Sequence, residues 1–165
     1  MTTHRATPAR TNSGVRVTIH RYQVSVVHDE DARYPRGEAV TSARDAAALA
    51  RAVIGSDIAE LVVAIFIDAR HKIIGYAEIA RGTLNASRFQ PRDILVPALH
   101  ANAAALIVAH NHPSGDCSPS AADRRVTSAL RQACELVGVP MLDHLVVTAD
   151  RHHSFAAEPG WDGSQ

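Results

Sequence analysis

Residues 105–116 read ALIVAHNHPSGD, a short apolar run that ends in two histidines and a Pro-Ser-Gly turn. An apolar run of this length, bounded by loop residues, is typical of a buried strand. Side chains two positions apart on a strand point to the same face, so we expect His110 and His112 to converge while Asn111 faces away. Two imidazoles on one face can share a metal ion. The sequence therefore predicts a candidate metal site at the end of this strand.

A third candidate ligand follows in the helix after the loop. Ser120 is a typical N-cap residue, and Asp123 falls in the first turn of the helix that Ser120 opens. The loop of seven residues from Pro113 to Pro119 carries this turn back toward the histidines. Two nitrogens and one carboxylate oxygen, with no evident fourth protein ligand, fit a catalytic zinc site, because structural zinc is closed by four ligands, usually with cysteines.

Each half of this pattern also has an ordinary structural explanation. A Ser-x-x-Asp sequence is a common helix start, and a lone His-x-His pair is usually structural or on the surface. The two halves together, at this spacing, are more specific than either alone. From composition and spacing, the sequence indicates a candidate metal site beside a strand.

Further short motifs surround the pattern. They are Gly82-Thr83-Leu84, Pro91-Arg92-Asp93, Asn102-Ala103-Ala104, Pro119-Ser120 and Leu142-Asp143-His144. With the histidine stretch, they resemble the C-terminal domain of RadC-type proteins over about residues 40 to 158. RadC-type domains are similar to the JAB/MPN (JAMM) metalloproteases, whose metal motif is His-x-His, seven residues, Ser, two residues and Asp. The resemblance implies an α/β fold, a cytidine deaminase-like α/β/α sandwich with a mixed, curved sheet, and a hydrolase in which His110, His112 and Asp123 hold Zn²⁺.

The family pattern also requires a glutamate upstream of the histidines, and we predict Glu78 for this role. It precedes the Gly82-Thr83-Leu84 step by a few residues, as the glutamate of the family pattern does. A carboxylate beside a metal-bound water can accept its proton and later deliver it to a leaving amine. The competing candidate is Glu60, which lies before the first strand of the hairpin that carries Glu78. Strand alternation alone also allows Glu78 to face solvent.

The resemblance implies hydrolysis of an amide bond in a peptide or protein substrate. In this interpretation Glu78 activates the zinc-bound water, and Ser120 helps to stabilise the oxyanion in addition to capping its helix. Catalytic peptidases of the family usually have Ser or Thr where this chain, like RadC-type sequences, has Asn111, so the substrate stays open. A zinc nucleobase deaminase would need His-x-Glu and Pro-Cys-x-x-Cys. The sequence has no Pro-Cys-x-x-Cys motif.

Two other functional classes stay open. A DNA-repair or DNA-processing accessory role is associated with RadC-type proteins, and it needs a phosphate-binding surface. The available arginines are those of the N-terminal segment and Arg124, Arg125 and Arg131, for which a solvated helix face is the more ordinary explanation. The third class is a non-catalytic binding module, although retention of all five motif residues argues against it.

Composition narrows the setting. The chain has 165 residues, with 17 basic and 17 acidic side chains, so it lacks the basic signature of a nucleic-acid binder and any DNA association is expected to be weak or indirect. No long apolar run and no signal peptide is visible, which predicts a cytoplasmic protein without a membrane segment. Two cysteines form no disulfide framework. The sequence leaves the oligomeric state open, with a homodimer as one alternative.

We predict one domain between two tails. Residues 1–15 are expected to form a flexible, mildly basic N-terminal tail, residues 16–158 the RadC-like domain with its motif-bearing core at 40–158, and residues 159–165 a C-terminal tail. RadC-type proteins usually carry a helix-hairpin-helix region before this domain. Nothing like it is visible here, so we expect a stand-alone catalytic domain.

Apolar periodicity predicts the elements around the motif. Helices are expected at 42–54, from Pro91 to about Asn102 with an irregular first half because of Pro97, and at 123–137. The last of these helices has a predicted apolar stripe. Its members are Val126, Ala129, Leu130, Ala133 and Val137. Strands are expected within 15–27 and at 61–67, 72–79 and 141–148, with a turn at 150–153.

Two more side chains are singled out by position. His144 matches a family position, and we expect it to support the ligands or pack beside them rather than bind the metal. Cys117 lies in the loop of the metal motif, and we interpret it as an ordinary loop residue. The alternative for Cys117 is a thiol that coordinates zinc or is oxidised beside it.

Overall fold

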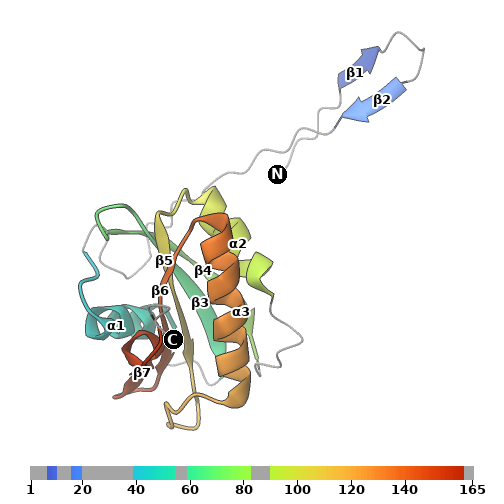
Figure 1. The fold of residues 1–165 in the computed structure, drawn as a ribbon. Coiled ribbons are helices and arrows are strands. Elements are labelled where there is room, and N and C mark those ends of the chain that lie inside the picture. Colours follow the sequence, from blue (N-terminus) through green and yellow to red (C-terminus); the bar gives the residue numbers. More distant parts are fainter. Residues whose placement is uncertain (1–6, 11–15, 20–38, 55–58, 83–89, 162–165) are drawn as a thin grey trace.

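The computed structural model describes residues 7–10, 16–19, 39–54, 59–82 and 90–161. Figure 1 shows a central sheet with helices on both sides. The predicted helices and strands of residues 42–148 are present, with ends that differ by at most a few residues. In chain order the elements are β1 (Thr7–Arg10), β2 (Arg16–Ile19), α1 (Ala43–Ile54), β3 (Leu61–Ile67), β4 (Ile73–Arg81), α2 (Pro91–His100), β5 (Ala105–Asn111), α3 (Ala121–Val137), β6 (Met141–Val147), β7 (His152–Ser154) and the 3₁₀ turn η1 (Phe155–Ala157).

The main sheet has five strands in the order β4-β3-β5-β6-β7. Only the β5–β6 pair is parallel, and the other neighbours are antiparallel, so the sheet is mixed. The side chains of β3 are buried on both faces. One face packs against α1 and the other against α2 and α3, which gives two separate apolar cores. The fold is therefore the predicted α/β sandwich with three layers.

The hairpin of β1 and β2 forms a separate two-stranded antiparallel sheet. It pairs Thr7 with Ile19 and Arg10 with Arg16. Part of the segment predicted as a flexible tail, residues 7–10, is therefore a strand, because its backbone groups bond to the strand expected after residue 15. The rest of the predicted N-terminal tail and residues 20–27 of the predicted strand region lie outside the described residues.

Helix α2 is helical from Pro91 to His100 although Pro97 lies inside it. The predicted irregular first half is therefore wrong. Proline removes only its own N–H from the helix, and the first turn here is secured separately. Gln90 and Asp93 form a reciprocal capping box, in which the Gln90 N–H donates to the Asp93 carboxylate at 2.9 Å. Pro91 at the first helical position suits this start.

The buried face of α3 is rotated relative to the predicted stripe. Its buried residues are Asp123, Thr127, Leu130 and Cys134, while Val137 is 41 % exposed. Polar residues at 123 and 127 occupy the buried face because they take part in the site described below, so an apolar pattern alone could not locate that face. Burial in the core raises the pKa of the Cys134 thiol to about 11.

The C-terminal region is more ordered than the sequence indicates. His152 and His153, placed in a predicted turn, form with Ser154 the edge strand β7 against β6. Trp161, placed in the predicted tail, packs against the core between the sheet and α3. Asp143 explains part of this order, because its carboxylate accepts hydrogen bonds from the Ser154 hydroxyl at 2.6 Å and the Ala156 N–H at 2.9 Å. None of the helices in the described segments is both long and apolar enough to cross a membrane.

Candidate metal centre

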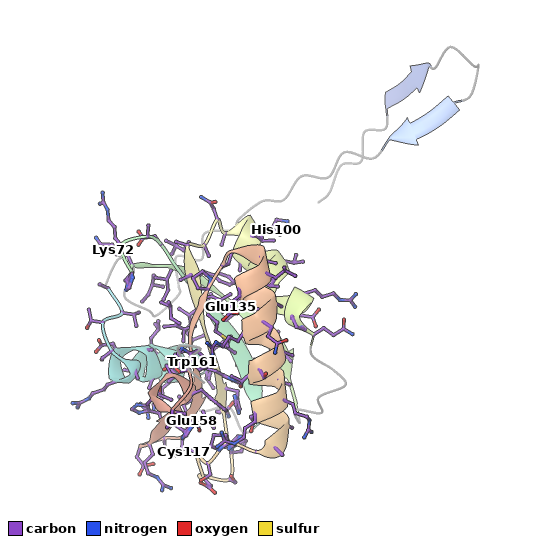
Figure 2. All side chains as sticks on the ribbon, viewed as in Figure 1. Lys72, His100, Cys117, Glu135, Glu158 and Trp161 are labelled. Atoms are coloured by element: carbon purple, nitrogen blue, oxygen red, sulfur yellow. The ribbon has the colours of Figure 1, made fainter. Side chains whose placement is uncertain are left out.

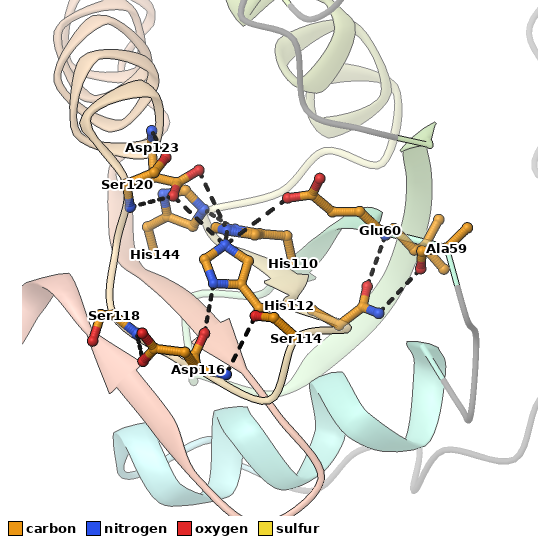
Figure 3. Close-up of polar contacts among 12 residues, drawn as sticks. Ala59, Glu60, His110, His112, Ser114, Asp116, Ser118, Ser120, Asp123 and His144 are labelled. Carbon is orange, nitrogen blue, oxygen red and sulfur yellow. Dashed lines mark hydrogen bonds and ion pairs between the residues drawn. The ribbon is translucent and has the colours of Figure 1, made fainter.

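The two histidines of the motif meet at the end of β5. His110 is the next-to-last residue of the strand, and its side chain is fully buried. The Nε2 atoms of His110 and His112 lie 3.1 Å apart. Figure 3 shows the two imidazoles side by side. The predicted convergence of these residues is therefore observed, and it follows from their common face on an extended segment.

Asp123 reaches the histidines from the start of α3. Its carboxylate oxygens lie 3.4 Å from His110 Nε2 and 3.6 Å from His112 Nε2. The capping box holds this side chain, because the Ser120 N–H donates to Asp123 Oδ2 at 2.7 Å and the Asp123 N–H donates to Ser120 Oγ at 3.2 Å. Ser120 thus has the predicted N-cap role. The structure brings together all three predicted ligands.

Glu60, and not Glu78, is the glutamate beside the histidines. Glu60 Oε1 lies 4.0 Å from His112 Nε2. Glu60, His110 and His112 each offer a ligand atom, and these atoms all lie within 4.8 Å of one another. Figure 3 shows Glu60 and Asp123 approaching the imidazoles from opposite sides.

The position of Glu78 corrects our choice between the two glutamates. Glu78 pairs with Val63 in the sheet, and Val63 belongs to the core on the α1 face. His110 pairs with Val62, which belongs to the core on the α2 and α3 face. Paired residues of neighbouring strands share a face, so Glu78 and His110 point to opposite sides of the sheet. The Glu78 carboxylate instead forms an exposed ion pair with Arg81 at 3.3 Å.

A signal for Glu60 is present in the register of the sheet. The antiparallel pairing of β3 with β5 places Val62 opposite His110. The two strands run in opposite directions, so Glu60, two residues before Val62, lies opposite His112, two residues after His110. The sequence shows two apolar runs of equal length, but it does not show that they pair with each other in this register.

Asn111 holds the backbone on both sides of Glu60. Its side-chain Oδ1 accepts a hydrogen bond from the Leu61 N–H at 2.7 Å, and its Nδ2 donates to the Ala59 carbonyl at 3.1 Å. The predicted orientation of Asn111, away from the histidine pair, is confirmed by these contacts. The residue between the two histidines thus fixes the segment that carries the neighbouring carboxylate.

Hydrogen bonds on the far side of each imidazole orient its Nε2 atom. His112 Nδ1 lies 2.7 Å from the Asp116 carbonyl oxygen. A carbonyl can only accept, so His112 Nδ1 carries a proton and Nε2 is the nitrogen left to bind a metal. Burial lowers the pKa of His110 to about 4, although the Asp123 carboxylate opposes this shift. His110 is therefore neutral at pH 7 and able to act as a ligand.

The donor set fits a metal ion. Around a tetrahedral ion with bonds of about 2.0–2.1 Å, ligand atoms lie about 3.3 Å apart. The two Nε2 atoms are 3.1 Å apart, and each faces a different Asp123 oxygen, with Oδ1 at 3.4 Å from His110 and Oδ2 at 3.6 Å from His112, so each separation is close to this value. Two imidazole nitrogens and a carboxylate this close together, with no cation among them, repel one another through their lone pairs. The residues therefore form a candidate metal site with three protein ligands.

The arginine face of α3 is largely neutralised by acidic partners. Arg124 Nη1 lies 2.8 Å from Glu158 Oε2, and Arg131 Nε lies 3.3 Å from Glu135 Oε1. The guanidinium of Arg131 also stacks over Trp161 at 5.1 Å. Figure 2 shows Glu135, Glu158 and Trp161 along this side of α3. These contacts agree with an ordinary helix face and give no support to a phosphate-binding surface.

The chain belongs to the RadC-like JAB domain family, whose pattern it matches over residues 40–161. It is 46 % identical to a UPF0758 protein of Chromobacterium violaceum over 125 residues, which are 76 % of this chain and 55 % of that protein. It is 50 % identical over 111 residues to a UPF0758 protein of Burkholderia mallei and covers 40 % of its length. A UPF0758 protein of Vibrio cholerae is 41 % identical over 142 residues, with 89 % of its length covered. The chain thus spans about half the length of the first two relatives, and their names state no activity.

Proposed function

We propose that this protein is a zinc-dependent hydrolase that cleaves an amide bond in a peptide or protein. The observation that carries the proposal is the cluster of His110, His112 and Asp123, with donor separations of 3.1, 3.4 and 3.6 Å and Glu60 next to it. Imidazole and carboxylate ligands suit zinc. Three protein ligands leave a position open for water, as catalytic zinc sites do.

His110, His112 and Asp123 would hold the ion. Zinc bound there would lower the pKa of a coordinated water toward about 7 and polarise a substrate carbonyl. The rest of the chemistry falls to side chains of this chain. The Glu60 carboxylate would take the proton of the water and return it to the leaving amine, which is general acid–base work.

Ser120 has a second role in this proposal. Its Oγ accepts the hydrogen bond of the Asp123 N–H, and that bond does not use the hydroxyl hydrogen. The hydroxyl is able to donate this hydrogen to the oxyanion that forms on the substrate carbonyl. Ser120 would thus cap α3 and stabilise developing charge at the same time.

The experiment uses zinc-loaded protein and a panel of fluorogenic peptide and isopeptide substrates. We expect wild-type protein to cleave at least one of them, Glu60→Gln to be inactive while still binding zinc, and Glu78→Gln to match wild type. The Glu78 variant is the matched control because it makes the same chemical change on the other face of the sheet. Equal loss of activity in both variants, or full activity of Glu60→Gln, would contradict the proposal.

A further inference from the structure

A buried series of hydrogen bonds starts at His110 Nδ1, on the side of the imidazole away from the candidate metal position. His110 Nδ1 lies 3.0 Å from His144 Nε2, and His144 Nδ1 lies 2.6 Å from Thr127 Oγ1. Thr127 Oγ1 in turn lies 2.6 Å from the Asp123 carbonyl oxygen. All four residues are buried. These hydrogen bonds therefore connect two of the proposed ligands, His110 and Asp123, through His144 and Thr127, which do not reach the metal position.

The direction of every hydrogen bond in this series follows from the last acceptor, the Asp123 carbonyl oxygen. The Asp123 carbonyl has no hydrogen, so the Thr127 hydroxyl must donate its only hydrogen to it. Thr127 Oγ1 can then only accept from His144, which places a proton on His144 Nδ1. The His144 ring is buried, and burial disfavours the charged form, so with its one proton on Nδ1 the ring presents a bare Nε2. That bare nitrogen accepts from His110 Nδ1–H.

We infer that Thr127 and His144 are positioning residues that set the tautomer of His110, so that its Nε2 lone pair faces His112 and Asp123. The inference rests on the proposed metal role of His110. A metal binds only a nitrogen without a proton. A hydrogen-bond chain that holds the proton on the other nitrogen therefore prepares the site before the metal arrives.

The His144 ring is itself held in place. Phe155 stacks on it, with ring centroids 5.1 Å apart and ring planes 14° apart. Phe155 follows Ser154, whose hydroxyl is bound by the Asp143 carboxylate. Asp143 and His144 are neighbours in the Leu142-Asp143-His144 motif. His144 belongs to the hydrogen-bond relay, and Asp143 fixes the position of Phe155, the ring that stacks on His144.

The Nδ1 atoms of the two proposed ligand histidines are held by different partners. His112 donates directly to the Asp116 carbonyl in the loop, and its side chain is 17 % exposed. His110 is fully buried and reaches a carbonyl only through His144 and Thr127. The relay returns to Asp123, the residue that supplies the third ligand. Removal of the Thr127 hydroxyl should therefore disturb His110 without touching His112.

The first test needs no metal and no variant. Long-range ¹H–¹⁵N correlation spectra of metal-free, ¹⁵N-labelled protein at pH 7.5 distinguish the two tautomers of each histidine. We expect protons on Nδ1 of both His110 and His144. A neutral His110 ring with its proton on Nε2 would overturn the inference, whether or not the protein binds zinc.

The second test measures zinc affinity by competition with a chromogenic chelator. Thr127→Val keeps the branched shape and removes the hydroxyl, and we expect it to bind zinc about 10- to 100-fold more weakly. Thr127→Ser restores the hydroxyl and should lie within about threefold of wild type. Thr148→Val is the matched control, because it removes another buried threonine hydroxyl, one that contacts Arg151 rather than His144 or Asp123. Equal affinity of Thr127→Val and wild type would also overturn the inference.

The two tests separate failure of the relay from failure of the proposed function. If wild-type protein binds no zinc, the proposed function fails and the tautomer spectra alone decide the relay. If zinc binds tightly and Thr127→Val binds it equally well, the metal site stands and the relay does not.

Discussion

The two carboxylates that flank the histidines are held in different ways. Asp123 has a side chain that is 4 % exposed, and both its carboxylate and its backbone N–H bond to Ser120. Glu60 is 16 % exposed and lies 4.0 Å from His112. Asn111 forms hydrogen bonds with the backbone of the two residues next to Glu60, Ala59 and Leu61, and not with the Glu60 carboxylate. The Asp123 carboxylate is therefore fixed through the cap of α3, whereas the position of Glu60 is set through its backbone neighbours on the segment before β3.

The largest expected effect comes from exchanging each carboxylate for an amide. Asp123→Asn should weaken zinc binding more than 100-fold, beyond the 10- to 100-fold typical of residues that only support ligands. Glu60→Gln should weaken it less than about tenfold, because Glu60 is not a ligand in this account. Chelator competition measures both values. Equal losses of zinc affinity in the two variants would indicate that Glu60 is also a ligand and would contradict the different roles given to Asp123 and Glu60.

The second effect is a loss of stability of the metal-free protein in mild acid. The pKa of His110 is lowered to about 4 in the folded protein, and an unfolded histidine has a pKa near 6.5. Between these values the unfolded chain binds more protons, so stability falls as the pH falls below about 6.5. We expect a loss of about 2 kcal/mol between pH 7.5 and pH 5 from His110 alone.

Urea unfolding of metal-free protein at a series of pH values tests this expectation. Stability that is constant from pH 7.5 to pH 5 would contradict it. Saturating zinc should oppose the loss at each pH, since a ligand that binds only the folded state stabilises it.

The third effect isolates the Glu60 side of the site. Asn111→Ala removes the partners of the Leu61 N–H and the Ala59 carbonyl, which should cost about 1–2 kcal/mol of stability. Hydrolysis should fall more than zinc affinity, because the metal ligands are untouched. Asn111→Asp keeps an acceptor for Leu61 and loses the donor to Ala59, so it should lie between alanine and wild type. A loss of zinc affinity as large as that of Asp123→Asn would contradict this division.

The smallest effect is expected at Glu78. Its ion pair with Arg81 is about half exposed on both sides, and such pairs contribute little to stability. Glu78→Gln should change the free energy of unfolding by less than about 0.5 kcal/mol. It should leave zinc affinity unchanged as well. A large effect on the free energy of unfolding or on zinc affinity would contradict the placement of Glu78 outside the site.

The part of the site that is local in sequence could be predicted. His110 and His112 are two residues apart on one strand, and Ser120 and Asp123 belong to one helix start, so simple periodicity defines each pair. The convergence of the two histidines and the cap that carries Asp123 therefore follow from short stretches of chain. The layers of the fold follow in the same way, because the apolar patterns of α1, β3 and β5 are strong and local.

The remainder depends on strand register, which a single sequence does not display. Glu60 is a neighbour of His112 only because β3 pairs with β5 in a register that places Val62 beside His110. Glu78 lies on the opposite face because β4 pairs it with Val63 rather than with Val62, and this register is also not visible in the sequence. The burial of Thr127 on α3 was missed for a related reason, since a polar residue on a buried face is explained only by partners from other elements.

The central claim is that His110, His112 and Asp123 bind one zinc ion. Elemental analysis of purified protein tests it most directly, with His112→Ala and Asp123→Ala as site variants. His100→Ala, at an exposed histidine on α2, serves as the control. We predict about one zinc per chain in wild type and in the control, and none in either site variant. Absence of zinc from wild-type protein after zinc has been supplied, or zinc retained in both site variants, would contradict the account.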